Sequence, residues 1–205
     1  MKKQLIRMKQ MSENINGMRL ILASGSPRRQ ELLKEMGLEF DVEVKEGIAE
    51  TYPETMNVKD VAEYIANEKA DAYVGGMRKG DVVITADTTV VLDKVILGKP
   101  HDVEDAKRML RMLSGRKHKV ITGVCIVKEG GRVSFSVETK VTMRVLSEEM
   151  IDRYVEEYRP LDKAGAYGIQ EWIGLVGIDY IEGSYQNVMG LPTQRLYAEL
   201  CALGK

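Results

Sequence analysis

The segment from residue 19 to residue 29 constrains the fold more than any other part of the chain, because it predicts a strand, a tight turn and a helix in direct succession. Its apolar residues 20–22 have the composition of a short buried strand. Four small residues follow, and Pro27 suits the first turn of a helix, where its missing N–H is not needed. The segment therefore predicts a strand–turn–helix unit.

Two arginines, Arg28 and Arg29, stand in the first turn of this predicted helix, where they oppose the positive end of the helix dipole. A bound anion would explain them. Free backbone N–H groups, the hydroxyls of Ser24 and Ser26, and the two guanidinium groups would together form a phosphate-binding corner. The alternative is an ordinary strand–turn–helix unit in which Ser26 is only the N-cap and both arginines are solvated.

Hydrophobic periodicity predicts alternating helices and strands along the rest of the chain. Helices are expected over 27–36, from Asn57 as cap to the glycines at 75 and 76, from Asp102 as cap to residue 113, from Ser147 onward and from Pro192 onward. Strands are expected over 38–44, 82–87, 90–92, 120–127, 133–145 and 176–181. Residues 45–56 and 160–170 are expected to form loops. This alternation predicts an α/β fold with a mixed sheet.

The composition limits the partners and the compartment of the protein. Its 205 residues, 44% of them hydrophobic and 30% charged, suit one globular unit or two small lobes. The net charge of −1 provides no field that would attract nucleic acid or an anionic membrane, so neither is expected as a partner. Cys125 and Cys201 are too few for a disulfide framework, and we expect a cytoplasmic protein. Residues 1–18 are basic and polar, which predicts a loosely ordered extension rather than a secretory signal, and no transmembrane span is expected.

Three charged residues outside the first segment are candidates for chemistry. Asp87 follows the apolar run 82–86, and an acid at the carboxyl end of a buried strand lies where ligands of open α/β sheets bind. Lys69, on a predicted helix, and Lys99, between a glycine and a proline, are possible charge partners for phosphate. Each has an ordinary alternative, because strand-end acids and surface lysines are usually solvated.

Two further segments have compositions suited to ligand binding. Residues 161–170 combine glycines, the charged pair Asp162 and Lys163, and the terminal amide of Gln170, which would allow the backbone to approach a ligand. Residues 183–192 repeat the opening pattern of small polar residues before a proline-led helix. A surface loop with one local ion pair and a plain helix start are the alternatives. No histidine or cysteine has the spacing of a zinc site.

Six blocks in this order resemble the Maf, or septum-formation-protein-like, family of nucleoside triphosphate pyrophosphatases. The blocks are residues 23–29, 86–88, 98–100, 113–124, 162–170 and 183–192. The resemblance implies a two-lobed α/β fold similar to the inosine triphosphatase group, with the active site in the cleft between the lobes. Residues 19–205 would form a single catalytic domain of two lobes.

The Pro-Arg-Arg form at 27–29, together with residues 162–170, looks like the branch of the family that hydrolyses dTTP and UTP. The resemblance implies that Arg28, Thr88 and Gln170 determine the substrate. One position departs from the family, which usually has glycine after the Gln170 position, whereas Glu171 stands here.

The resemblance also implies a mechanism in which water attacks the α-phosphorus and releases pyrophosphate. Asp87 is implied as the catalytic acid, and Glu50 matches an acid often present in the family that would help to bind a metal. Hard oxygen ligands favour Mg²⁺ or Mn²⁺. We expect three cations to neutralise the charge of the triphosphate: Arg29, Lys69 and Lys99.

Two other functions remain open from the sequence. The same chemistry could act on a modified or purine nucleotide. Alternatively, the protein could bind nucleotides without turnover and regulate cell division. A homodimer is expected only from the resemblance.

Overall fold

The computed structural model describes residues 17–203, so the extension expected over 1–18 lies outside them except for its last two residues. The helices are α2 (Pro27–Glu35), α3 (Val61–Val74), α4 (Val103–Leu113), α5 (Glu148–Tyr158), the 3₁₀ helix η1 (Ala164–Ala166), α6 (Trp172–Gly177), α7 (Tyr185–Met189) and α8 (Thr193–Leu203). The strands are β1 (Arg19–Leu22), β2 (Asp41–Val42), β3 (Asp81–Leu92), β4 (Val95–Leu97), β5 (Lys117–Lys128), β6 (Gly131–Met143) and β7 (Ile178–Glu182).

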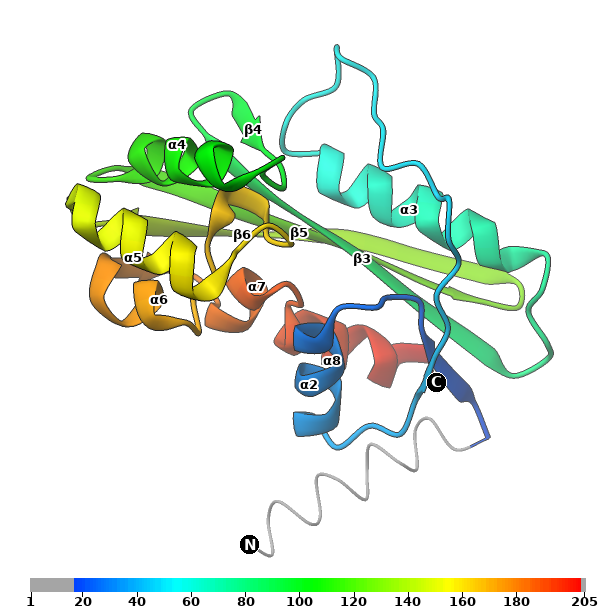
Figure 1. The fold of residues 1–205 in the computed structure, drawn as a ribbon. Helices are drawn as coiled ribbons and strands as arrows, with labels where there is room; N and C mark the ends of the chain where they lie inside the picture. Colours follow the sequence, from blue (N-terminus) through cyan, green and yellow to red (C-terminus); the bar gives the residue numbers. More distant parts are fainter. Residues whose placement is uncertain (1–16, 204–205) are drawn as a thin grey trace, which may run out of the picture.

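The described strands form one mixed sheet in the order β2-β1-β3-β5-β6-β7, with β4 also paired with β3. The pairs β1–β2 and β1–β3 are parallel, and the others are antiparallel. Strands β5 and β6 make a long hairpin that runs the length of the molecule (Figure 1). The mixed sheet with helices on its faces confirms the predicted fold class.

The edge of β3 that carries β1 is only partly paired. Strand β1 ends at the pair Leu22–Ile84, and the pairing of β3 with β4 starts at Val90, opposite Leu97. Among the described residues, residues 85–89 of β3 are therefore paired on the β5 side alone. The sequence prediction that β3 breaks after Asp87 was wrong, since β3 runs unbroken from 81 to 92. Asp87 lies in the middle of the strand and borders a gap in the sheet.

Helices cover both faces of the sheet, and strand alternation assigns side chains to each face. Ile84 and Ala86 of β3 pack in the cluster that also holds residues of α2 and α8. Thr85 points to the other face, where its hydroxyl donates to the carbonyl of Ala66 in α3. A Cβ atom at Gly123 of β5 would lie 2.2 Å from the backbone nitrogen of Glu63, so only glycine lets α3 lie this close.

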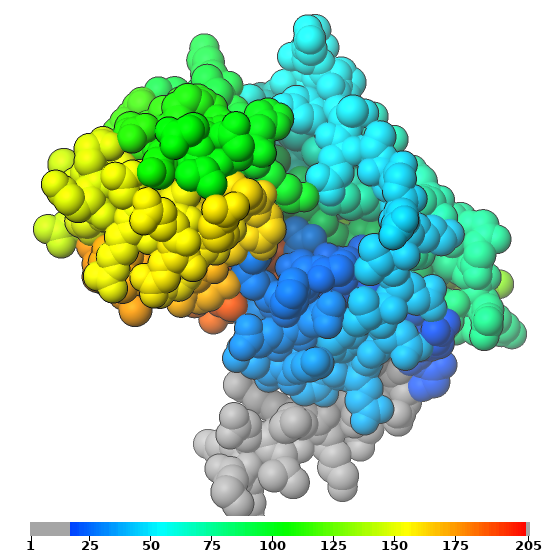
Figure 2. Space-filling model, viewed as in Figure 1, coloured from blue at the N-terminus to red at the C-terminus, as the bar shows by residue number. Residues whose placement is uncertain are grey.

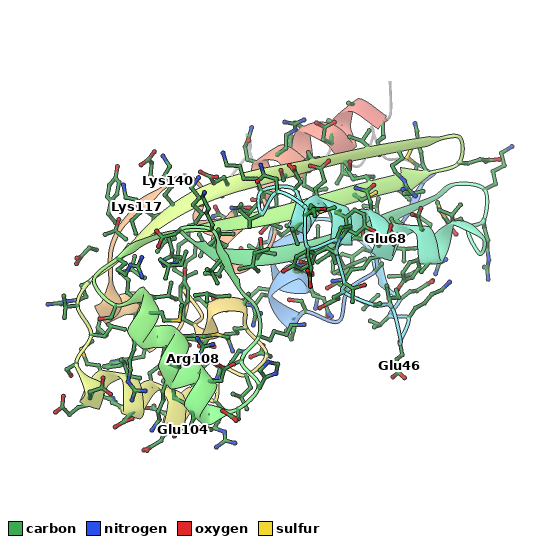
Figure 3. All side chains as sticks on the ribbon, turned by 90° about the horizontal axis from the view of Figure 1, so that it is seen from above. Glu46, Glu68, Glu104, Arg108, Lys117 and Lys140 are labelled. Atoms are coloured by element: carbon green, nitrogen blue, oxygen red, sulfur yellow. The ribbon has the colours of Figure 1, made fainter. Side chains whose placement is uncertain are left out.

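Two large hydrophobic clusters lie at opposite ends of the sheet (Figure 1). One cluster is formed by residues of α4 and α5 with the end of β3, the start of β5 and the end of β6. The other is formed mainly by residues of β1, α2, α8 and the first half of β3. Helix α4 shows how such a layer forms. Its buried residues include Ala106 and Leu110, whereas Glu104 and Arg108 point outward (Figure 3).

Several element boundaries differ from the sequence prediction. Asn57 does not cap α3, because its side chain accepts from Lys59 N in a separate turn and the helix begins at Val61. The strand expected over 38–44 is reduced to β2, and the short helices α6 and α7 were not predicted. In the part of the chain that the structure describes, no helix has both the length and the apolarity to cross a membrane.

Candidate active site

A cavity of about 680 Å³ opens at the gap in β3, where the turn after β1, the loop after β2 and the segment after α5 converge. Figure 2 shows this face, with α4 and α5 (green and yellow) on one side and the segments up to α3 (blue and cyan) on the other. Every residue that the sequence analysis assigned to the site lines the cavity: Ser24, Ser26, Arg28, Arg29, Glu50, Lys69, Asp87, Thr88, Lys99 and Gln170.

Lys69 lies at the centre of the charged groups. Its Nζ is 2.6 Å from Oε1 of Glu50 and 2.8 Å from Oδ1 of Asp87. The other carboxylate oxygen of Glu50 lies 3.5 Å from Nζ of Lys99. Lys69 and Asp87 are largely buried, whereas Glu50 and Lys99 are exposed. Positive and negative groups from four segments thus alternate along one wall of the cavity.

The surroundings of Glu50 favour its charged form. Partial burial raises the pKa of Glu50, but the hydrogen bond and charge of Lys69, together with those of Lys99, lower it by more. The net result is a pKa below the usual value, so Glu50 stays ionised at neutral pH.

The same two carboxylates suit a hard divalent cation. Magnesium is usually held in proteins by one or two carboxylates together with substrate phosphates and water. The described residues contain no group of three or more acidic, histidine or cysteine side chains that could hold a metal alone. Asp87 and Glu50 therefore fit a cation that arrives with a polyphosphate, because Lys69 contacts only one oxygen of each carboxylate.

Arg29 is engaged mainly by the protein itself. Its Nε donates to the carbonyl of Gly190 at 2.8 Å, and its Nη1 donates to the carbonyl of Ala86 at 2.9 Å. Nη1 also donates to Oγ of Ser24 at 3.1 Å, and Nη2 to Oγ1 of Thr88 at 3.2 Å. Four of its five N–H groups thus have protein partners. Arg29 ties α2 to the unpaired edge of β3 and to the turn before α8, with one N–H left for a ligand.

Replacing Arg29 by lysine is expected to lower the free energy of unfolding by about 2 kcal/mol, because a single ammonium cannot reach acceptors on three segments. Urea denaturation measures this. Arg195→Lys is the matched control, since Arg195 is exposed and pairs with Glu199 one turn away. Equal stability of the two variants would contradict a tethering role for Arg29.

Arg28 points the other way, across the cavity. Its Nη1 lies 3.1 Å from Oδ2 of Asp162, which joins the first turn of α2 to the segment after α5. Ser26 begins α2 without a hydrogen bond from its side chain, so its hydroxyl stays available. The first amides of α2 have no partner within the helix. Ser26, Arg28 and these amides therefore lie together at the cavity, where the phosphate corner is predicted.

The hydroxyl of Thr88 is less available than the sequence suggested. Thr122 donates its hydroxyl hydrogen to the carbonyl of Asn187 at 3.0 Å, so it accepts the hydrogen of Thr88, 3.0 Å away. Thr88 also accepts from Arg29. A ligand could therefore only donate to Thr88. Gln170, by contrast, is exposed at the mouth of the cavity.

The cavity is also lined by Lys163 and Tyr167, which were not assigned to the site from the sequence. Lys163 is 9% exposed, with its Nζ 2.7 Å from Asp162 and 3.1 Å from Glu171. Tyr167 has its hydroxyl 2.7 Å from Nε2 of His118, which is buried. Burial lowers the pKa of His118 to about 4, so this imidazole is neutral at pH 7 and supports Tyr167 rather than carrying charge. The sequence signal for both residues was the composition of residues 161–170, with its glycines and the charged pair of Asp162 and Lys163.

Comparisons with known proteins identify the family of the chain. A family model described as Maf-like protein matches residues 19–203. A dTTP/UTP pyrophosphatase from Phocaeicola vulgatus is 54% identical over 190 residues, which cover 93% of this chain and 98% of the relative. One from Bacteroides thetaiotaomicron is 49% identical over 187 residues, covering 91% of this chain and 97% of the relative.

Among solved structures, the Staphylococcus aureus Ham1 protein is similar in fold, with a TM-score of 0.51. Its sequence is 15% identical, and the match covers 88% of this chain and 99% of that one. This likeness concerns the fold alone. The family match over nearly all of the described residues is the stronger finding. The chain belongs to the Maf-like protein family.

Proposed function

We propose that the protein is a nucleoside triphosphate pyrophosphatase that hydrolyses dTTP and UTP to the monophosphate and pyrophosphate. One observation carries the proposal: cations and carboxylates from separate elements face one cavity of nucleotide size. Simple anion binding would not need Asp87 and Glu50 beside the anion. The relatives at 54% and 49% identity, both named dTTP/UTP pyrophosphatase, support this substrate choice.

The cations of the cavity would hold the triphosphate. Arg29 lies on α2 with one N–H free for a ligand, Lys69 lies on α3 and Lys99 in the turn after β4, so positive charge faces the ligand from three segments. The unpaired amides at the start of α2 add donors for one phosphate. Because phosphoryl transfer depends on charge stabilisation and positioning, these groups can supply most of the stabilisation of the transition state.

The bond that breaks joins the α-phosphorus to the oxygen bridging to the β-phosphate. A water oxygen forms the new bond to the α-phosphorus, and pyrophosphate leaves with the bridging oxygen. Asp87 would accept the proton of this water, while Lys69, 2.8 Å away, holds the carboxylate in place. A Mg²⁺ or Mn²⁺ ion held by Asp87 and Glu50 would neutralise charge on the phosphate oxygens.

Gln170 would read the base. Its amide offers a donor and an acceptor, which complement the adjacent carbonyl and N–H of uracil or thymine. Arg28 adds guanidinium donors on the opposite wall of the cavity. The methyl group that distinguishes thymine from uracil makes no hydrogen bond, so the two bases present the same edge to these groups.

A panel of nucleoside triphosphates tests the proposal. We expect dTTP and UTP to turn over fastest with Mg²⁺ or Mn²⁺, and EDTA to abolish turnover. Orthophosphate should appear only after inorganic pyrophosphatase is added. Direct release of orthophosphate would place the cleavage at the γ-phosphate and contradict the proposal. Preference for purine or modified nucleotides would favour the second substrate class, and binding without turnover would favour a regulatory protein.

We further propose that the enzyme works in the cytoplasm, as a homodimer, without a nucleic-acid or membrane partner. The near-zero net charge supports the absence of a nucleic-acid or membrane partner, because it creates no overall positive potential that would attract a polyanion.

A further inference from the structure

The side chain of Glu171 joins the ends of the segment that carries Gln170. Its Oε1 lies 3.1 Å from Nζ of Lys163. Its Oε2 accepts a hydrogen bond from the hydroxyl of Tyr154 in α5. That hydroxyl in turn accepts from the backbone N–H of Gly168 at 2.9 Å. A single carboxylate therefore connects α5, Lys163 and the backbone two residues before Gln170.

The backbone around Glu171 is folded tightly on itself. The N–H of Glu171 donates to the carbonyl of Gly168 at 3.0 Å, which closes a turn with Gln170 inside it. A Cβ atom at Gly168 would lie 2.7 Å from Cδ of Glu171, so the carboxylate packs directly on this glycine. A Cβ atom at Gly174 would lie 1.8 Å from the carbonyl oxygen of Ile169. The position of Gln170 thus depends on where the Glu171 side chain lies.

The charges around Glu171 alternate up to the cavity wall. Arg28 pairs with Asp162, Asp162 with Lys163, and Lys163 with Glu171. Lys163 is 9% exposed and Glu171 is 19% exposed, so this ion pair is shielded from water. Burial and the hydrogen bond to Glu171 raise the pKa of Tyr154, which keeps its hydroxyl protonated as a donor. Removing one charge from such a buried network displaces the remaining partners.

We propose that Glu171 is a positioning residue for recognition of the pyrimidine base, which it serves by fixing the turn at 168–170 through Lys163 and Tyr154. The inference rests on the proposed function, because it assigns Gln170 to the base. Glu171 itself does not touch the base or the reacting phosphate. Its contribution is the fixed backbone turn from which the Gln170 side chain extends.

Glu171→Gln tests this role, because it keeps the shape and the acceptor for Tyr154 but removes the charge that holds Lys163. We expect KM for UTP to rise about tenfold with kcat within about twofold of the wild type, as for the loss of one well-placed hydrogen bond. Inhibition by inorganic tripolyphosphate, which has no base, should keep its Ki within about twofold. Glu157→Gln is the matched control, since Glu157 forms an exposed pair with Arg153 on α5.

Tyr154→Phe provides a second test through the other contact, because it removes one hydroxyl and keeps the buried ring. It should reproduce the split between a raised KM for UTP and an unchanged Ki for tripolyphosphate. An unchanged KM in both variants would overturn the inference, as would equal weakening of UTP and tripolyphosphate binding. If the wild type itself fails to hydrolyse the triphosphate panel, the proposed function fails instead, so the two failures are distinguishable.

Discussion

Replacing Asp87 by asparagine is expected to lower kcat for dTTP and UTP by about 100-fold or more while the protein stays folded. Asparagine has the same shape but can neither accept the proton of the attacking water nor supply a charged oxygen to a cation. Folding should survive, because Lys69 keeps its pair with Glu50 at 2.6 Å. Pyrophosphate release at saturating substrate measures kcat, and urea denaturation checks the fold.

Asp93→Asn is the matched control for this variant. Asp93 directly follows β3, the strand that carries Asp87, and its exposed carboxylate pairs with Arg116 at 2.6 Å. Its backbone is left-handed, with a φ of 57°, which asparagine tolerates as well as aspartate does. Turnover should therefore stay at the wild-type level. Wild-type turnover in Asp87→Asn, or an equal loss in Asp93→Asn, would contradict the role of Asp87.

The sequence placed Asp87 in the site for a reason that the structure only partly supports. The acid was expected at the carboxyl end of a strand, yet it lies in the middle of a strand of twelve residues. It reaches a cavity because β1 stops at Leu22, opposite Ile84, and the pairing of β3 with β4 starts only at Val90, which leaves the intervening edge of β3 open. This gap depends on the register between strands distant in sequence. Local periodicity contains no information about that register.

Strand alternation explains how neighbouring residues of β3 came to have different roles. Asp87 points to the face covered by α3 and meets Lys69. Thr88 points to the opposite face and meets Arg29. The sequence made Asp87, Thr88, Lys69 and both arginines candidates, with Arg28 expected at the base and Arg29 at the triphosphate, but it did not predict that Arg29 would be held mainly by the protein. The separation of the two arginines into a tether, Arg29, and a cavity cation, Arg28, arises from contacts up to 161 residues apart in the chain.

Lys69→Met is expected to lower kcat/KM for dTTP and UTP by about 100-fold or more, with a smaller effect on stability. Methionine retains the length of the aliphatic chain and removes the ammonium that lies 2.6 Å from Glu50 and 2.8 Å from Asp87. The triphosphate then loses a cation, and the two carboxylates lose the group that fixes their positions. Lys107→Met is the matched control. Lys107 is 13% exposed, close to the 14% of Lys69, and pairs with Asp152 at 2.6 Å outside the cavity.

The double variant Lys69→Met/Asp87→Asn shows whether Lys69 and Asp87 act together or independently in turnover. If Lys69 acts chiefly by holding Asp87, either substitution alone already removes most of their joint contribution. Turnover by the double variant should then be within about tenfold of that of the slower single variant. Independent roles would instead multiply to a loss of about 10,000-fold. The 2.8 Å contact and the burial of both side chains favour the first outcome. A multiplicative loss would assign Lys69 to the phosphates alone and leave Asp87 to be positioned by other groups.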